Sequence, residues 1–415
     1  MNLLRTSFIH KEATWLLLIL VIGLALRVVA ISTLSYTPVS DELAYRSMAL
    51  NLVNGNGIVD FMGNHAMFNV GYPLFILAPV FAVFGEAPLI ARLLNAFLGG
   101  LDIVLCYMIA KEAGAGPSGR LLAAALWALY LPASVYTVYL MKENLMTPLI
   151  LGVMWCVLRL AKEPAYITAV GCGLLFGLLA LTGNAALSLA VPVILALAFT
   201  TANLGRKVMV ALLILIEAAL VAAPWMVRNA EVLGTPILNT NSGFNLYLGN
   251  NPAATGMFVS IADTPRGQTW QELKRQKGEV LASETLKEEA LAWIKEHPST
   301  FVALTLKKAV LFWTPPFHDG KGQASTGEPM IRLLWAIQFV ALLAGAIGSF
   351  FVPRLRSHPM AVLWLAIVSY TAVHMLFYVI FRYREPIMPL VCVLAAMVFE
   401  SPLDRWRYIP GRPSA

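Results

Sequence analysis

Long apolar runs separated by short polar connections dominate the chain. Each run approaches the about 20 residues that a transmembrane helix needs, and each carries few charges. The pattern predicts an all-α polytopic membrane protein with ten spanning helices, near residues 14–34, 88–110, 120–138, 144–160, 166–182, 184–200, 208–227, 331–352, 360–380 and 386–400. No small-residue cleavage site follows the first run, so we expect an anchor helix there rather than a cleaved signal peptide.

Two long polar segments interrupt this pattern, at residues 35–87 and 228–330. The second contains the Gly/Asn-rich stretch "TNSGFNLYLGNNPAATG", in which "GFNLYLGNNP" has the composition of an outer loop with turns. A charged stretch predicted to be helical follows, and then "FVALTLKKAVLFW", which is too short to span and suits a helix in the membrane interface. The expected parts are therefore a seven-span module (1–227), an extracytoplasmic segment (228–330) and C-terminal helices with a tail (331–415).

Composition agrees with a membrane protein. Of 415 residues, 59% are hydrophobic and 13% are charged, whereas a soluble domain carries about 25% charged residues. The net charge of +7 would suggest a nucleic-acid partner in a soluble protein; here it is spread over the connections between spans, and we expect no nucleic acid. The four cysteines lie inside apolar runs without metal-binding spacing, which predicts buried thiols and no disulfide framework.

Basic residues are distributed unequally between the two sets of connections. One set contains most of them, namely Arg5, Lys11, Lys111, Arg120, Arg159, Lys162, Arg206, Lys207, Arg354, Arg356, Arg405, Arg407 and Arg412. The short loops of the other set contain only Arg46, Lys142, Arg382 and Arg384. The positive-inside rule then predicts that both termini are cytoplasmic and that the two long polar segments lie outside.

The acidic pair Asp41 and Glu42 opens the first outer segment, in "SDELAYRSMALNLVNGNG". This segment holds further acids but only one basic residue, Arg46. The two carboxylates are either solvated loop charges or groups that do chemistry at the membrane surface. Glu143 adds an acid on the same face, although the start of a helix favours a carboxylate in any case.

Three ionisable residues are predicted inside spans. Arg27 lies in the outer half of the first helix, and Asp102 and Glu217 lie near the middles of theirs. Charges at that depth are costly unless they pair or face a wet cavity, so each residue has either a structural partner or a functional role. Arg27 either pairs with one of these acids or extends outward toward Asp41.

Three arginines are predicted at the outer membrane face. Arg228 follows the seventh span in "APWMVRN", and Arg382 and Arg384 lie in "FRYREPIMP" between the last two spans. Guanidinium groups bind phosphate through two parallel hydrogen bonds, so this set would suit an anionic lipid head group. Anchoring to bulk anionic lipid, with Trp225 and Tyr383 as interfacial aromatics, explains the same residues equally well.

These motifs occur in an order that is known from one family. An arginine in the first helix precedes "DELAYRSMALNLVNGNG", "GYPLFIL", "ARLLNAFLGG", "KENL", "PWMVRN" with "GFNLYLGNNPAATG", and "RYREPIMPL". Together they resemble the bacterial members of the dolichyl-phosphate-mannose protein mannosyltransferase-like family, within the GT-C superfamily of integral membrane glycosyltransferases. The resemblance runs from about residue 20 to about residue 400 and is strongest in the acidic loop and the Arg-Tyr-Arg segment.

The resemblance implies a GT-C-type fold and an enzyme that transfers one sugar from a polyprenyl-phosphate donor to an acceptor outside the cytoplasm. It also implies that Asp41 is the general base and that Glu143 is the acid of the second outer loop. Two basic residues of related enzymes have no match. One belongs ahead of the first-loop proline, in "MFNVGYP", and one after the fifth span, where "LTGNAAL" offers Gly183 and Asn184.

The residues suit this chemistry. A carboxylate can take the proton of an acceptor hydroxyl while the bond to the anomeric carbon forms, and arginines can stabilise the departing phosphate. One direct displacement would invert the anomeric centre. We expect Glu42 to be a neighbour of the base or a contact for the acceptor or a metal ion. The substrate-binding candidates are Tyr45, which would share a helical face with Asp41, and Arg46, Arg27, Arg228, Arg382, Tyr383 and Arg384.

A divalent cation is a further candidate ligand. The carboxylates of Asp41 and Glu42 would suit Mg²⁺ or Mn²⁺. A lipid-monophosphate donor lacks the diphosphate that usually recruits such an ion, so we expect no strict requirement. His65, His318 and His374 are weaker candidates for a phosphate or metal contact.

Two other functions stay open on the sequence. A transporter or flippase of lipid-linked sugars would place charges along a path through the spans and show repeat symmetry. An O-antigen-type polymerase or ligase would place its main arginines in large outer loops. The expected location is the bacterial inner membrane. The sequence leaves open the sugar and whether the acceptor is a protein, a lipid or a polysaccharide.

Overall fold

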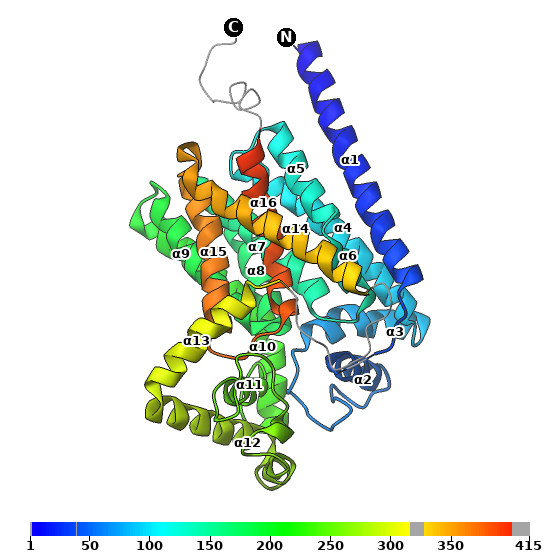
Figure 1. The fold of residues 1–415 in the computed structure, drawn as a ribbon, viewed down its shortest axis with the longest axis vertical. Helices are drawn as coiled ribbons and strands as arrows, with labels where there is room; N and C mark the ends of the chain where they lie inside the picture. Colours follow the sequence, from blue (N-terminus) through cyan, green and yellow to red (C-terminus); the bar gives the residue numbers. More distant parts are fainter. Residues whose placement is uncertain (1, 39, 316–327, 401–415) are drawn as a thin grey trace.

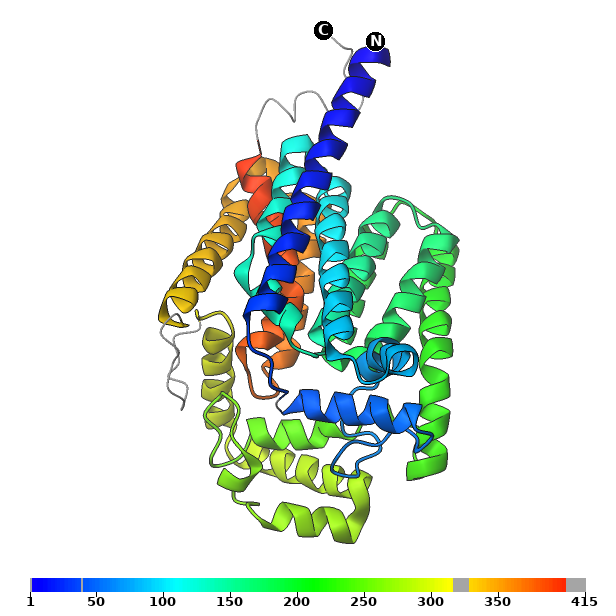
Figure 2. The same ribbon diagram turned by 90° about the vertical axis from the view of Figure 1, so that its right-hand side faces the viewer.

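The structure, a computed structural model, describes residues 2–38, 40–315 and 328–400 of the chain. Within these ranges 78% of the molecule is helical, and extended backbone pairs only at a bridge between Met257 and Val379. The helices form two layers, a larger layer of apolar helices and a second layer of helices that lies across one end of the first (Figures 1 and 2). The fold is therefore the all-α membrane fold that the sequence predicts.

The first layer contains the apolar helices α1 (Asn2–Thr33), α4 (Pro88–Glu112), α5 (Pro117–Ala128), α6 (Leu131–Val135), α7 (Glu143–Lys162), α8 (Tyr166–Thr182), α9 (Ala190–Phe199), α10 (Leu204–Leu233), α14 (Glu328–Gly348), α15 (His358–His374) and α16 (Met388–Phe399). The second layer contains α2 (Asp41–Val53), α3 (Ala78–Phe84), α11 (Asn241–Gly249), α12 (Thr269–Glu296) and α13 (Pro298–Phe312). Helix α1 begins, and α16 ends, at the end of the molecule opposite the second layer (Figure 1).

Each predicted span coincides with a helix or with consecutive helices. Five described segments are long and apolar enough to cross a membrane, namely Lys11–Thr33, Pro88–Glu112, Glu143–Lys162, Leu204–Leu233 and Pro329–Phe351. A sixth crossing arises if Pro117–Ala128 and Leu131–Val138, bent by 54°, form one broken span. The remaining predicted spans coincide with the shorter helices α8, α9, α15 and α16, so the count of ten stays a prediction.

Residues at the helix ends explain where several helices start and stop. Proline occupies the first position of α4, α5 and α13, where its missing N–H is not needed. The Asn203 side chain caps α10 by accepting a hydrogen bond from the Arg206 N–H at 2.9 Å. Gly234 ends the same helix in the left-handed conformation, with φ of 74°.

One stretch with turn-like composition is helical. Asn241–Gly249, inside the stretch predicted to form a loop with turns, is helix α11. Its aromatic residues Phe244 and Tyr247 pack against α12, in a small core that includes Trp270 and Leu286. Burial of these apolar side chains outweighs the helix-breaking tendency of Gly and Asn. The first outer segment is also partly helical, because it contains α2, a π-helical turn at Pro73–Leu77 and α3.

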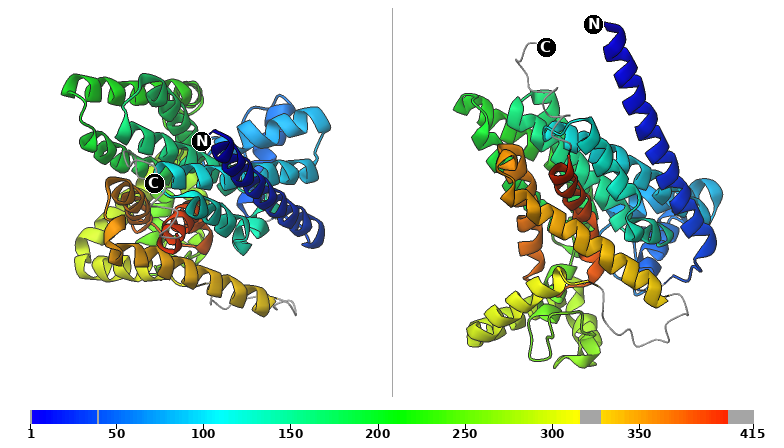
Figure 3. Two further views of the ribbon diagram at one scale, coloured as in Figure 1. Left: turned by 90° about the horizontal axis from the view of Figure 1, so that it is seen from above. Right: turned by 45° about the horizontal axis from the view of Figure 1, so that its top comes forward.

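The long helices share one hydrophobic core, which runs from α4 to α16. Helix α16 packs against α5 and α14, and α14 lies obliquely across it (Figure 3). Residues from the N-terminal and C-terminal parts of the chain are thus interleaved. This packing fixes the short segment between α15 and α16 relative to the start of α7.

The charged stretch predicted to be helical forms α12, which anchors the segment 35–87. It kinks at Gly278, whose φ of 77° favours glycine. The carboxylate of the next residue, Glu279, accepts hydrogen bonds from the backbone N–H groups of His65 (2.8 Å) and Ala66 (3.1 Å) and from the Thr240 hydroxyl. One side chain therefore ties α12 to two other outer segments.

The substitution Glu279→Ala tests this anchor. It leaves two backbone N–H groups without their acceptor, which costs about 1–3 kcal/mol of local stability. Hydrogen–deuterium exchange of the amides of His65 and Ala66 should accelerate by about fivefold or more. The matched variant Glu284→Ala, which removes an exposed pair with Lys287, should leave this exchange unchanged. Equal exchange in both variants would refute the anchoring role.

Candidate active site

Asp41 lies at the first position of α2, directly after a strained residue. Ser40 has φ of 50° and ψ of −118°, and among the described residues it is the one non-glycine with positive φ. Its hydroxyl donates a hydrogen bond to the Asp41 carboxylate at 3.2 Å. Such strain is found mainly where a side chain must be held in a particular place.

Arg382 joins Asp41 to a second acid. It lies in the 3₁₀ segment Phe381–Ile387 between α15 and α16, and its Nη2 pairs with Asp41 Oδ2. Its Nε lies 3.5 Å from Oε1 of Glu143, the first residue of α7. The three side chains are 18%, 23% and 7% exposed for Arg382, Asp41 and Glu143 respectively. The fold thus brings together two predicted acids and one predicted arginine.

Local electrostatics favour one protonation state for each of Arg382 and Tyr45. Burial alone would lower the pKa of Arg382, but the carboxylates of Asp41 and Glu143 outweigh it and raise that pKa well above its usual value. Burial raises the pKa of Tyr45, and the same two carboxylates add to the effect. Arg382 therefore stays cationic and the Tyr45 hydroxyl stays protonated at neutral pH.

Asp41 opens onto a cavity of about 320 Å³, which we call the Asp41 cavity. Its charged residues are Asp41, Lys142, Lys274 and Arg382. Its aromatic residues are Tyr45, Phe68, Phe244, Phe258, Trp270, Tyr378 and Tyr383, and its amides are Asn64, Asn69, Asn241, Asn245 and Gln271. Cavities of this size, with aromatic walls and a few converging polar groups, typically bind small ligands.

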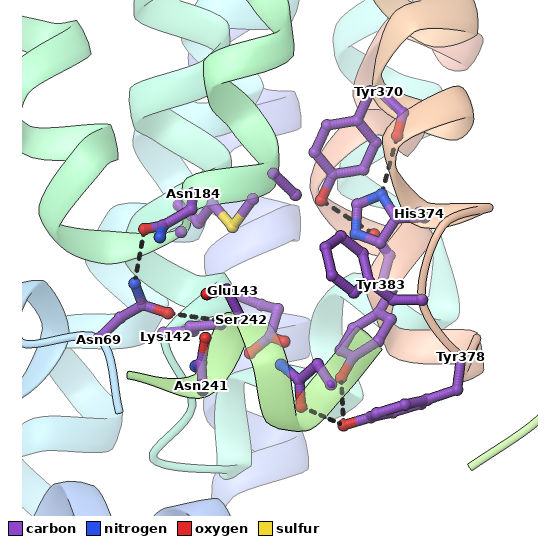
Figure 4. Close-up of a pocket in the computed structure, with 15 residues that line it drawn as sticks. Asn69, Lys142, Glu143, Asn184, Asn241, Ser242, Tyr370, His374, Tyr378 and Tyr383 are labelled. Carbon is purple, nitrogen blue, oxygen red and sulfur yellow. Dashed lines mark hydrogen bonds between the residues drawn. The ribbon is translucent and has the colours of Figure 1, made fainter. Parts of the chain in front are cut away.

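A second cavity, of about 120 Å³, adjoins the first, and we call it the Lys142 cavity. The two cavities share residues, among them Asn69, Lys142 and Tyr383. Figure 4 shows Glu143, Lys142 and Asn69 on one side of it and Tyr370, His374 and Tyr383 on the other. The Tyr383 hydroxyl donates to the Tyr378 hydroxyl at 3.1 Å, so hydroxyl groups are concentrated on this wall.

Two of the predicted site residues in the first outer segment lie outside both cavities. Glu42 is fully buried, and its carboxylate accepts a hydrogen bond from the Leu140 N–H at 2.6 Å. Arg46 forms an ion pair with Glu86. Both side chains connect α2 to neighbouring segments, whereas Asp41 and Tyr45 face the Asp41 cavity.

Arg228 and Arg384 are not next to Arg382 in the cavity wall. Arg228 donates to the carbonyl oxygens of Ile58 (2.8 Å) and His65 (3.0 Å), and so holds the first outer segment against α10. Arg384 is fully buried and donates to the carbonyl oxygens of Phe312 (2.7 Å) and Thr314 (2.6 Å). The structure therefore does not bring the three predicted phosphate-binding arginines together in one cavity.

Arg27 lies in the interior of the helical layer. It is fully buried, donates to the Gly23 carbonyl at 2.9 Å and packs against Gly99, where a Cβ atom would overlap its guanidinium. Asp102, one turn from Gly99 on α4, attracts it electrostatically. Glu217 packs against Gly173 of α8. Arg27 therefore lies near an acid within the helical layer, the first of the two predicted alternatives, and does not extend toward Asp41.

The carboxylates of Asp41 and Glu42 are not arranged as ligands of a divalent cation. Within the described ranges, no group of three or more His, Cys, Asp or Glu side chains converges where a metal ion could bind. The Asp41 carboxylate faces Arg382 and that of Glu42 faces Leu140. His65 lies against Arg228, His374 lines the Lys142 cavity, and His318 falls outside the described residues.

Several cavity residues were not among the predicted candidates. Lys142 was noted only as a basic residue in a short loop, although its position beside Glu143 was a usable signal. The asparagines of the cavity walls come from three distant segments, 64–69, 184 and 241–245. Only the fold shows that they converge.

Several solved structures resemble this chain, among them archaeal oligosaccharyltransferases. One is the archaeal oligosaccharyltransferase AglB from Archaeoglobus fulgidus in complex with an inhibitory peptide and a dolichol-phosphate, with TM-score 0.56, 16% identity, and coverage of 97% of this chain and 52% of that one. The A. fulgidus oligosaccharyltransferase tethered to an acceptor peptide has TM-score 0.56, 14% identity, and coverage of 94% and 49%. ArnT from Cupriavidus metallidurans in the apo state has TM-score 0.49, 13% identity, and coverage of 96% and 62%.

No protein-family model and no curated protein matches the sequence. This chain spans about half the length of the archaeal oligosaccharyltransferase that it resembles. At 16% identity the likeness extends over nearly the whole of this chain and concerns the fold. The chain therefore has the GT-C-type membrane fold, whereas the mannosyltransferase-like family within it is not shown.

Proposed function

We propose that the protein is a glycosyltransferase that moves a single sugar from a polyprenyl-phosphate donor to an acceptor hydroxyl on the extracytoplasmic face of the membrane. The observation that carries this proposal is the partly buried Asp41 carboxylate, held by Arg382 in a cavity of aromatic and amide side chains. The positive-inside pattern supports the outer location of this cavity.

The lining of the Asp41 cavity supports a sugar substrate. Aromatic faces suit the apolar faces of a sugar ring, and side-chain amides both donate and accept hydrogen bonds with hydroxyl groups. Cations in the same wall suit the phosphate of the carrier. The similar oligosaccharyltransferase structure contains a dolichol-phosphate and an inhibitory peptide, which supports a lipid-phosphate ligand in this fold.

The reaction that this arrangement suits is a single displacement. The Asp41 carboxylate takes the proton of the acceptor hydroxyl, and the acceptor oxygen forms a bond to the anomeric carbon. The bond between that carbon and the phosphate oxygen breaks, and its electron pair stays on the phosphate. The cationic side chains of the wall stabilise the charge that develops there, and the anomeric centre inverts.

Arg382 and Tyr45 position the base in this proposal. Arg382 pairs with the Asp41 carboxylate and fixes its orientation, while Glu143 contacts the guanidinium from the other side. Tyr45, one helical turn after Asp41, is buried and makes T-shaped ring contacts with Phe68 and Tyr72. The acceptor requires only an accessible hydroxyl, so proteins, lipids and polysaccharides all stay candidates.

Transport of a lipid-linked sugar is less well supported. A transport path would line up the charges within the spans, yet Asp102 and Glu217 lie on different helices and line neither the Asp41 cavity nor the Lys142 cavity. The polymerase or ligase alternative requires its arginines in large outer loops. Arg382 lies instead in a seven-residue segment between two helices.

The substitution Asp41→Asn tests the proposed base. Purified protein is incubated with labelled polyprenyl-phosphate hexoses and pentoses and with a cell-envelope extract, and labelled acceptor is counted. The variant should lose at least about 100-fold of the transfer rate, because the amide cannot accept the proton. Donor binding should be retained.

The matched control is Glu288→Gln, which changes an exposed acid on α12. It should transfer at the wild-type rate. Transfer by a folded Asp41→Asn variant at more than half the wild-type rate would exclude Asp41 as the base.

A double-mutant cycle tests whether Arg382 acts through Asp41. Arg382→Gln should lower the transfer rate by about 10- to 100-fold, because the carboxylate loses its orientation. Combined with Asp41→Asn it should cause no further loss, since both changes disable one unit. Losses that multiply in the double variant would show that Arg382 acts independently.

A further inference from the structure

Lys142 lies where the two cavities meet. Its side chain lines both the Asp41 cavity and the Lys142 cavity, and it directly precedes Glu143 at the start of α7. Figure 4 shows it beside Asn69 and Ser242, across the cavity from Tyr383. A ligand that occupied both cavities would have to pass this side chain.

The ammonium group of Lys142 is held by a relay of two asparagines. Its Nζ donates to Asn69 Oδ1 at 3.0 Å, and the Asn69 amide nitrogen donates to Asn184 Oδ1 at 2.9 Å. This second bond turns the Asn69 carbonyl oxygen toward the lysine. An ammonium group has three donors, and the relay uses one of them.

The charge of Lys142 is less compensated than that of Arg382. No carboxylate in the described part of the chain lies within 4.0 Å of the Lys142 ammonium, whereas Arg382 contacts both Asp41 and Glu143. Burial lowers the pKa of Lys142, and the more distant Glu143 and Asp41 offset part of that effect. An anionic oxygen at this position would compensate the buried charge directly.

Two segments without basic residues meet at this lysine. They are "MFNVGYP" and "LTGNAAL", neither of which contains a lysine or an arginine. Their polar residues Asn69 and Asn184 are hydrogen-bonded to each other, and Lys142 reaches them from a third segment. Lys142 thus supplies the cation at the place where these two uncharged segments meet.

We propose that Lys142 is the phosphate-binding residue of this site. It donates a hydrogen bond to an oxygen of the polyprenyl phosphate at the junction of the two cavities. Arg382 instead pairs with the carboxylates of Asp41 and Glu143. Asn69 and Asn184 position the ammonium group. The assignment to the donor lipid rests on the proposed function, but the binding of phosphate can be measured without sugar transfer.

The test compares ligands that differ only in the phosphate. Undecaprenyl phosphate and undecaprenol are titrated into the purified full-length protein, and bound lipid is measured by native mass spectrometry. Lys142→Gln should weaken undecaprenyl phosphate binding by about 10- to 100-fold, as expected for a charge-assisted hydrogen bond, with undecaprenol binding unchanged. Lys142→Arg should restore most of the affinity.

Two matched variants separate this role from general charge effects. Lys277→Gln removes an exposed lysine of α12 and should bind both lipids like the wild type. Arg382→Gln should weaken undecaprenyl phosphate binding less than Lys142→Gln does. Retained undecaprenol binding shows that each variant is folded.

Several results would overturn the assignment. One is wild-type affinity of Lys142→Gln for undecaprenyl phosphate, and another is a larger loss in Arg382→Gln than in Lys142→Gln. A Lys142 effect on glycerol 3-phosphate, without one on the lipid, would point to a soluble phosphate instead. Lys142-dependent lipid binding without transfer from any donor would contradict only the proposed function. Transfer with Lys142-independent lipid binding would contradict only this inference.

Discussion

The contact of Arg382 with Asp41 and Glu143 is the interaction on which the rest of the site depends. It joins the start of α2, the start of α7 and the segment between α15 and α16, which are separated by hundreds of residues in the sequence. Burial of a guanidinium is costly, and charged partners such as these two carboxylates offset that cost. The interleaved packing of the long helices brings the three segments to one end of the molecule.

The basic residues around this contact have different kinds of partner, and this difference suggests that they have different roles. Arg382 is paired with carboxylates, and Arg228 and Arg384 are bound to backbone carbonyl oxygens. Lys142 has a neutral amide as its hydrogen-bond partner. In the proposed mechanism Arg228 and Arg384 hold the architecture and Arg382 orients Asp41, while Lys142 keeps capacity for an anion. A membrane enzyme that handles a lipid phosphate would need both functions at one boundary.

The sequence predicted the helical membrane fold and the central pair of the site, because hydropathy and the order of motifs depend on local residues. The candidates Asp41, Glu143, Tyr45, Arg382 and Tyr383 all line one or both cavities. Five other candidates, Arg27, Glu42, Arg46, Arg228 and Arg384, lie outside both cavities, since the partner of a charged side chain is not evident until the chain is folded. Helix α11 was mistaken for turns because tertiary burial overrides the tendency of Gly and Asn. The relay of Lys142 with two asparagines depends on long-range packing, which no local pattern records.

The most direct test of the central claim is an experimental structure of the protein in lipid nanodiscs with bound undecaprenyl phosphate. The account predicts phosphate density at the junction of the two cavities, within hydrogen-bonding distance of Lys142 and on the Asp41 side of Tyr383. The lipid chain would then run from this point into the bilayer. Phosphate density at Arg228 or Arg384 instead, with both cavities free of lipid, would contradict the account.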